Sequence, residues 1–137
     1  MSSESSQPML LLAQLKDAWP GATWEWDERM KCVTATVLGS EEPGLRATVT
    51  TLLPEVWTAG TLASASEAVR ELVDKKGGMR GGQAIFCAPQ TDADATLIYC
   101  LWWPWGDKSR TSCRFGVANS GRPQELFPQI RALFGIK

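Results

Sequence analysis

The chain has 137 residues, 44% of them hydrophobic and 21% charged, and its formal net charge at pH 7 is −1. This length suits one domain with its own core, and the composition is typical of soluble folded proteins rather than disordered or membrane proteins. The lack of a basic excess disfavours nucleic acid as a partner. The polar start MSSESSQ contains no basic segment and no long apolar run. We therefore expect no export signal, no membrane association and a cytoplasmic location.

The residues that usually carry catalysis or hold metals are few. The chain has no histidine and four cysteines, which are Cys32, Cys87, Cys100 and Cys113. None of the cysteines forms a C-x-x-C pair, so we expect buried thiols and no metal or other cofactor. Ser64 and Ser66 have no histidine to activate them, and a cysteine nucleophile would lack the same base. The sequence therefore predicts no catalytic residue and a protein that is not an enzyme.

The pattern of apolar residues predicts one α+β domain over residues 8–137, preceded by a disordered lead at residues 1–7. Pro8 fits the first turn of a short helix, which Pro20 and Gly21 end.

Three strands are expected next. Residues 22–27 and 31–38 are rich in β-branched and aromatic side chains around a turn, and they place Trp24 and Trp26 on the core face. Leu45 to Leu53 alternates apolar and polar residues, which predicts a half-buried third strand.

The second half repeats this order. Ser64 to Glu67 is a capping box that predicts a helix start, and Gly77 suits the left-handed residue that ends the helix. Residues 83–88 are apolar and short, which favours a buried strand. A hairpin of two strands follows, and a last helix carries its apolar residues at Leu126, Ile130, Leu133 and Phe134.

The predicted order is thus α-β-β-β-α-β-β-β-α. It indicates an α+β fold in which an antiparallel sheet of about six strands has its helices packed on one face. Such an arrangement leaves the second face of the sheet open.

The segment YCLWWPWGDKSRTSCRF, from Tyr99 to Phe115, contains three tryptophans within four residues, followed by three cations. Gly106 and Asp107 suit a two-residue hairpin turn, which would set Trp103 opposite Arg110. A four-residue loop would shift the pairs by two but keep the same residues on each face, because side chains alternate along a strand. A three-residue loop would mix the two faces.

In the even registers one face of this hairpin interleaves rings and cations, and the other, with Ile98 and Val117, belongs to the core. The candidate binding residues on the first face are Tyr99, Leu101, Trp103, Trp105, Lys108, Arg110 and Arg114. Two interpretations stay open. Either a helix covers this face and the rings are ordinary core, or the face is exposed and binds a partner.

The same register sets Cys100 opposite Cys113. We expect reduced thiols there, with a cross-strand disulfide as the alternative.

The leading hypothesis is a non-catalytic protein-binding domain, such as a secretion-type chaperone, an adaptor or a toxin-neutralising immunity protein. Trp103 and Trp105 would anchor the partner, Arg110 and Arg114 would pair with carboxylates or carbonyls, and Lys108 would steer at the rim. A homodimer through the same face is the nearest variant. The alternatives are a tryptophan-lined pocket for a small apolar ligand, or weak binding of single-stranded nucleic acid.

Overall fold

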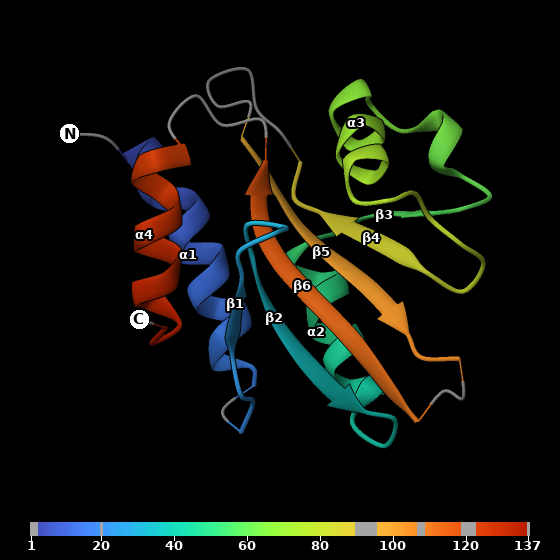
Figure 1. Ribbon diagram of the computed structural model, residues 1–137, viewed down its shortest axis with the longest axis horizontal. Helices are drawn as coiled ribbons and strands as arrows, with labels where there is room; N and C mark the ends of the chain where they lie inside the picture. Colours follow the sequence, from blue (N-terminus) through green and yellow to red (C-terminus); the bar gives the residue numbers. More distant parts are fainter. Residues whose placement is uncertain (1–2, 20, 90–95, 107–108, 119–122, 137) are drawn as a thin grey trace.

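The structure is a computed structural model that describes residues 3–19, 21–89, 96–106, 109–118 and 123–136 (Figure 1). Its strands are β1 (Glu25–Asp27), β2 (Cys32–Leu38), β3 (Glu55–Thr58), β4 (Ala84–Cys87), β5 (Leu97–Pro104) and β6 (Arg110–Ala118). They form one six-stranded sheet in the order β1-β2-β6-β5-β4-β3, and every neighbouring pair is antiparallel.

The helices are α1 (Ser3–Asp17), α2 (Glu42–Leu52), α3 (Glu67–Lys75) and α4 (Pro123–Leu133), with a 3₁₀ turn η1 (Leu62–Ser64) before α3. The predicted fold class is confirmed: this is a single α+β domain built on a six-stranded antiparallel sheet. α1 already begins at Ser3, ahead of Pro8, and the division into a lead of residues 1–7 and a domain of residues 8–137 stays a prediction. In the described part of the chain, no helix combines the length and apolar character that crossing a membrane requires.

The helices occupy both faces of the sheet, which corrects the prediction that they share one. α1, α2 and α4 pack on the face that carries Trp102 and Phe115, together with residues such as Leu15 and Ile130. α3 packs on the opposite face, against Tyr99 and Leu101. Figure 1 shows α2 behind the sheet, with β2 and β6 drawn in front of it.

The predicted third strand over Leu45–Leu53 is wrong, because most of this segment is helix α2. Its apolar residues Leu45, Val49 and Leu52 also fit helical spacing, and Val49 is buried. The threonines that suggested a strand satisfy their hydroxyls within the helix, since Thr50 Oγ1 donates to the carbonyl of Arg46 at 2.8 Å. The third strand is instead β3, which follows α2 directly.

Helix α3 begins two residues later than the capping box predicted. The N-cap is Ser66, whose hydroxyl accepts the backbone N–H of Val69 at 3.3 Å, whereas Ser64 ends the 3₁₀ turn. The predicted inward side of this helix is confirmed, since Val69, Leu72 and Val73 are buried. Gly77 adopts a positive φ of 96°, the left-handed conformation predicted at the end of this helix.

The remaining predicted elements are present with altered lengths. β4 and α4 form where the apolar patterns indicated, and α4 contains Pro128 within its length. β1 covers only the last three of the residues predicted for the first strand. Trp24 and Trp26 pack against the same core cluster as Val33, as predicted.

Candidate functional site

The β5–β6 hairpin has the four-residue loop rather than the two-residue turn. The N–H of Trp105 donates to the carbonyl of Arg110 at 2.8 Å, and Trp103 lies opposite Ser112. The predicted pairing of Trp103 with Arg110 is therefore wrong by two residues. Each side chain of the hairpin still lies on its predicted face, because side chains alternate with a period of two and the register is shifted by two residues. Lys108, predicted at the rim, lies outside the described residues.

Tyr99 and Leu101 are buried and cannot touch a partner. Each is only 1% exposed, and both belong to the cluster formed with Val69, Leu72 and Val73 of α3. The prediction of these two residues as partner contacts is wrong because α3 covers the part of the sheet that the sequence analysis left open.

The uncovered part of this face lies toward the hairpin loop. Three rows of side chains cross the sheet there. Arg114 lies opposite Thr34 on β2, Ser112 lies opposite Thr36 and Trp103, and Arg110 lies opposite Leu38 and beside Trp105. We call the members of these rows that remain partly or fully exposed the ring–cation surface, which comprises Thr34, Thr36, Leu38, Trp103, Trp105, Arg110, Ser112 and Arg114.

At the inner end of the ring–cation surface, Arg114 lies between the ring of Trp103 and the carboxylate of Asp27. Its guanidinium carbon lies 4.7 Å from the centre of the Trp103 ring, and its Nε lies 3.8 Å from Oδ2 of Asp27. Oδ1 of Asp27 accepts the N–H of Met30 at 3.0 Å, which fixes the carboxylate in the β1–β2 turn. The cation is thus positioned over the ring before any partner arrives.

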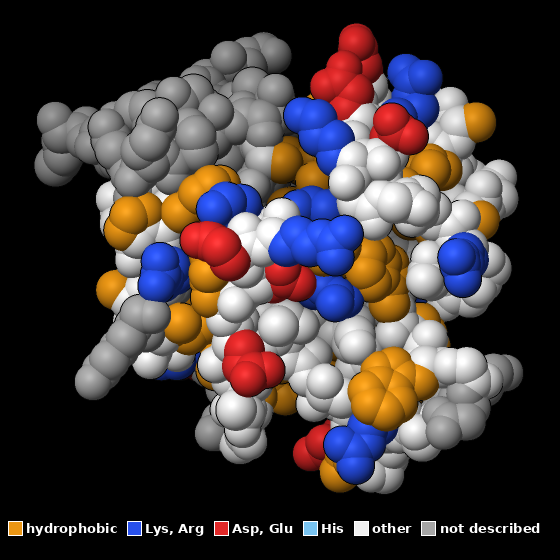
Figure 2. Space-filling view, in the orientation of Figure 1, with side chains coloured by type: hydrophobic (Ala, Val, Ile, Leu, Met, Phe, Trp, Pro, Cys, Tyr) orange, Lys and Arg blue, Asp and Glu red, His pale blue; other side chains and the backbone are white. Residues whose placement is uncertain are grey.

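The outer end of the surface is open to solvent. Trp105 is 44% exposed, its indole N–H donates to Oγ of Ser112 at 3.0 Å, and the guanidinium carbon of Arg110 lies 5.8 Å from its ring centre. Leu38, on the other side of Arg110, is 47% exposed. In Figure 2 hydrophobic and basic side chains lie next to one another toward this end of β5 and β6.

Beneath the surface, a small polar cluster joins α3 to the β1–β2 turn. Nζ of Lys76 donates to the carbonyl of Met30, and burial lowers the pKa of Lys76. Cys32 and Tyr99 are hydrogen-bonded through their side chains, and burial raises the pKa of the Cys32 thiol to about 11. At neutral pH Cys32 is therefore a protonated thiol rather than a nucleophilic thiolate.

Cys100 and Cys113 are free, buried thiols. They are diagonal neighbours, because Cys100 lies opposite Phe115 and Cys113 lies opposite Trp102, which corrects the predicted direct pairing. Burial raises the pKa of Cys100 well above its ordinary value. Within the described ranges, no three His, Cys, Asp or Glu residues are grouped in a way that could hold a metal ion.

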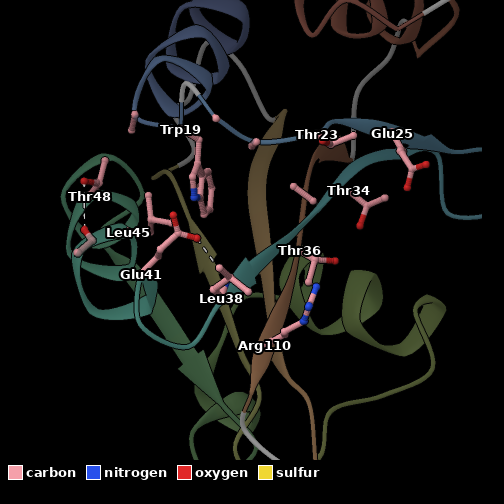
Figure 3. Close-up of a pocket in the computed structure, with 15 residues that line it drawn as sticks. Trp19, Thr23, Glu25, Thr34, Thr36, Leu38, Glu41, Leu45, Thr48 and Arg110 are labelled. Carbon is pink, nitrogen blue, oxygen red and sulfur yellow. Dashed lines mark hydrogen bonds between the residues drawn. The ribbon is translucent and has the colours of Figure 1, made fainter.

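A groove of about 980 Å³ borders the ring–cation surface, and the sequence analysis did not find it. It follows the outer edge of β2 beside α2 and the end of α1 (Figure 3). Leu38 was missed as well, although alternation along β2 already places it on the side opposite Val33, Ala35 and Val37. The groove could not be found from the sequence, because it depends on α2 being a helix.

No family model, curated protein or solved structure matches the chain. The fold and the surface therefore define it only as an α+β domain with a sheet face that one helix covers in part. Arguments about its function rest on the geometry of that surface.

Proposed function

We propose that the chain is a non-catalytic protein-binding domain, of the chaperone, adaptor or immunity type, that docks another protein on the ring–cation surface. The observation that carries the proposal is the outermost row, where Leu38 and Trp105 flank Arg110. Three large hydrophobic residues are exposed in the described part of the chain, and two of them are in this row. A concentration of exposed apolar side chains around a cation is typical of an interaction site.

The residue types in the row suit protein recognition. Tryptophan and arginine are the residues most enriched among those that dominate binding energy, and removing such an anchor costs about 2 kcal/mol or more. The indole N–H of Trp105 donates to Oγ of Ser112, which favours one orientation of the ring before a partner binds. Arg110 would pair with a carboxylate or carbonyl of the partner once the apolar neighbours exclude water.

The inner pair, Trp103 and Arg114, supports the anchor rather than making the main contact. Trp103 is half-buried, and the side chain of Arg114 is 21% exposed. Both present part of their surface to a docked protein, and the guanidinium of Arg114 already packs on the ring of Trp103.

The experiment is site-specific crosslinking followed by a measured affinity. A photoreactive amino acid replaces Trp105 in one variant and Leu10 in a matched control, since Leu10 is 61% exposed but lies on α1. The proposal expects a protein crosslinked from position 105 and not from position 10. With that protein purified, Trp105→Ala should weaken binding by roughly 30-fold, which corresponds to about 2 kcal/mol, and Leu10→Ala should leave it unchanged.

Stability measurements separate docking from folding. Because Trp105 is 44% exposed, Trp105→Ala should lower the free energy of unfolding by less than about 1 kcal/mol. An unchanged affinity in a folded Trp105→Ala protein would overturn the proposal. A crosslink to a second copy, with dimer dissociation in Trp105→Ala, would identify the partner as the chain itself.

The structure offers less to the two alternatives. The residues that line the groove include one tryptophan, Trp19, which is only 7% exposed, so the groove is not a tryptophan-lined pocket. Single-stranded nucleic acid would stack on Trp103 and Trp105, but the described part of this surface offers its phosphates two cations, Arg110 and Arg114, and Arg114 already lies 3.8 Å from the carboxylate of Asp27.

A further inference from the structure

A continuous series of contacts through the β1–β2 turn joins helix α3 to the ring–cation surface. Lys76 is the C-cap residue of α3, and its Nζ donates to the carbonyl of Met30 in that turn. The N–H of Met30 donates to Oδ1 of Asp27 at 3.0 Å. Oδ2 of Asp27 lies 3.8 Å from Nε of Arg114, whose guanidinium packs over the Trp103 ring. The same turn therefore contacts α3 on one side and the docking surface on the other.

The contact made by Lys76 moves with α3. The backbone N–H of Lys76 lies 3.1 Å from the carbonyls of both Leu72 and Val73, so this residue is part of the end of the helix. Its amine is half-buried, burial lowers its pKa, and a buried amine requires an acceptor such as the Met30 carbonyl. A displacement of α3 therefore withdraws the amine from the turn.

The segment that follows α3 has the properties of a hinge. It contains four glycines, at positions 77, 78, 81 and 82. Gly78 and Gly82 adopt positive φ values of 88° and 86°. At none of the four glycines does an added Cβ meet a described atom within 4 Å, so the loop is not packed there. Because glycine loses the most conformational freedom on folding, releasing this loop is favoured by entropy.

The cluster beneath α3 is separate from the main core and contains unpaired donors. One α-helix covers it, whereas three helices contribute to the cluster on the opposite face. Four buried side-chain nitrogens lack a hydrogen-bond partner among the described residues. Three of them are on the α3 face, namely Nε1 of Trp57, Nε1 of Trp103 and Nε of Arg114. Unpaired buried donors destabilise the closed arrangement, so this face is the one expected to open first.

We propose that α3 opens from the sheet as a unit about its glycine loop, and that Lys76 is a positioning residue for the ring–cation surface. With α3 closed, Lys76 holds the β1–β2 turn, and the turn holds Arg114 over Trp103. With α3 open this support is lost, so the closed state is the one that docks a partner. The last step rests on the proposed function, whereas the opening and the role of Lys76 are properties of the free chain.

The cysteines report the opening of α3, because they are divided between the two faces. Cys32 and Cys87 belong to the cluster beneath α3, Cys100 and Cys113 belong to the opposite cluster, and each is 0% exposed. Iodoacetamide at pH 8, with the modified peptides resolved by mass spectrometry, measures how often each thiol becomes accessible. In native buffer we expect the two thiols beneath α3 to react about a hundredfold faster than the other two.

Two substitutions separate the opening of α3 from unfolding of the whole chain. Ser66→Ala removes the hydroxyl that caps α3 and should speed the reaction of the two thiols beneath α3 about fivefold, without changing the other two. Val49→Ala removes a buried side chain of α2 on the opposite face. It should speed the reaction of Cys100 and Cys113 alone, because α3 can open without moving α2.

NMR of the free chain tests the role of Lys76. The ring current of Trp103 shifts the guanidinium resonances of Arg114, and Lys76→Met, which keeps the aliphatic stem but not the amine, should reduce that shift. Lys75→Met is the matched control, because Lys75 is the exposed neighbour on α3 and should leave the shift unchanged. Lys76→Arg keeps a cationic donor and should retain the shift.

A second pair and a second variant complete this test. Arg110, whose guanidinium carbon lies 5.8 Å from the centre of the Trp105 ring, is outside the series of contacts and should not respond to Lys76→Met. Should Lys76→Met not fold, Asp27→Asn breaks the same series at the next contact and should release Arg114 from Trp103.

Docking and closure are linked thermodynamically. With the protein that crosslinks from position 105, Lys76→Met should weaken docking by about threefold. A partner that binds the closed state better must also hold α3 closed, so at saturation it should slow the reaction of Cys32 and Cys87 by about tenfold.

Three results contradict the proposal. They are equal reaction rates of all four thiols, an unchanged Arg114 shift in folded Lys76→Met or an equal change in Lys75→Met, and a saturating partner that leaves the reaction of the thiols beneath α3 unchanged. If no protein crosslinks from position 105, the docking proposal fails instead. The thiol and NMR measurements on the free chain still decide whether α3 opens and whether Lys76 positions Arg114.

Discussion

Gly116 provides a sharp test of how closely the sheet and α3 enclose Tyr99. Tyr99 lies opposite Gly116, and a Cβ atom at Gly116 would be 2.8 Å from the Tyr99 hydroxyl oxygen, 3.0 Å from its Cζ and 3.1 Å from Cβ of Cys32. Real Cβ atoms do not tolerate the first of these distances. Because Tyr99 is 1% exposed and packed beneath α3, its ring has no free space to move into.

The expected cost of Gly116→Ala follows from two opposing effects. Inserting a methyl group into a packed core costs about 1–3 kcal/mol, while replacing glycine by alanine lowers the entropy of the unfolded chain and regains roughly 0.4–1 kcal/mol. The net loss should be about 1–2 kcal/mol. Urea unfolding measures it as a lower midpoint with an unchanged slope.

A second substitution assigns the clash to the hydroxyl group. In a Tyr99→Phe background the nearest atom is gone, so Gly116→Ala should cost less there by about 0.5–1 kcal/mol. Gly44→Ala in α2 is the control: no atom lies within 4 Å of its added Cβ, and alanine should stabilise the helix by up to about 1 kcal/mol. If Gly116→Ala leaves the free energy of unfolding unchanged, Tyr99 does not pack on Gly116. The conclusion that Tyr99 is buried and cannot contact a partner would then lose its support.

Two further predictions concern the cap of α3 and the buried thiols. Ser66→Ala should lower the free energy of unfolding in urea by about 1 kcal/mol, because the Ser66 hydroxyl accepts a helix N–H. Ser64→Ala should change it little, because Ser64 ends the 3₁₀ turn. A larger loss for Ser64→Ala than for Ser66→Ala would support the cap predicted from the sequence. Burial raises the pKa of Cys32 to about 11 and that of Cys87 to about 12, from an ordinary 9.0. Above pH 9 the unfolded thiols lose protons that the folded ones keep, so stability should fall between about pH 9 and 11. The lowered pKa of Lys76 acts in the opposite direction. A Cys32→Ala, Cys87→Ala protein should lose less stability over this range, and an equal loss would place the alkaline transition elsewhere.

The hairpin shows what alternation along a strand can predict. Which residues share a face with Trp103 followed from the period of two, and the structure confirms that division although the loop is longer than expected. The loop length was not predictable from Gly106 and Asp107, because a turn signal allows more than one even register. Exact partners such as Ser112 therefore required the structure.

The segment of α2 shows where alternation misleads. Leu45 and Val49 fit a strand at spacing two and a helix at spacing four equally well, and the polar residues between them completed the alternation that favoured the strand. Tertiary packing decided for the helix, because Val49 and Leu53 reach the core beside α1. The groove along β2 follows from this helix, so it was missed for the same reason.

The covering of Tyr99 and Leu101 was not encoded in any local pattern either. The amphipathic side of α3 was predicted correctly, but periodicity does not say which face of a sheet an amphipathic helix selects. The length of α3, by contrast, limits how much of the sheet face this helix can cover. Nine residues make a helix about 13 Å long and 10 Å wide, whereas the six-stranded sheet is about 24 Å across and its longest strand, β6, is about 26 Å long.

Three helices share the other face, whereas on this one the described residues place a single α-helix, α3, with the short 3₁₀ turn η1 before it. A single short helix must therefore leave part of the face in water, and it covers Tyr99 and Leu101 while the strand ends near the loop lie beyond it. The strand ends would need no rings or cations if they only had to be soluble, since polar side chains suffice there. Beyond the part of the sheet that α3 covers, folding does not require exposed apolar side chains. The exposed row of Leu38, Arg110 and Trp105 is therefore not explained by folding alone. That departure is the physical reason to assign this end of the sheet to a partner.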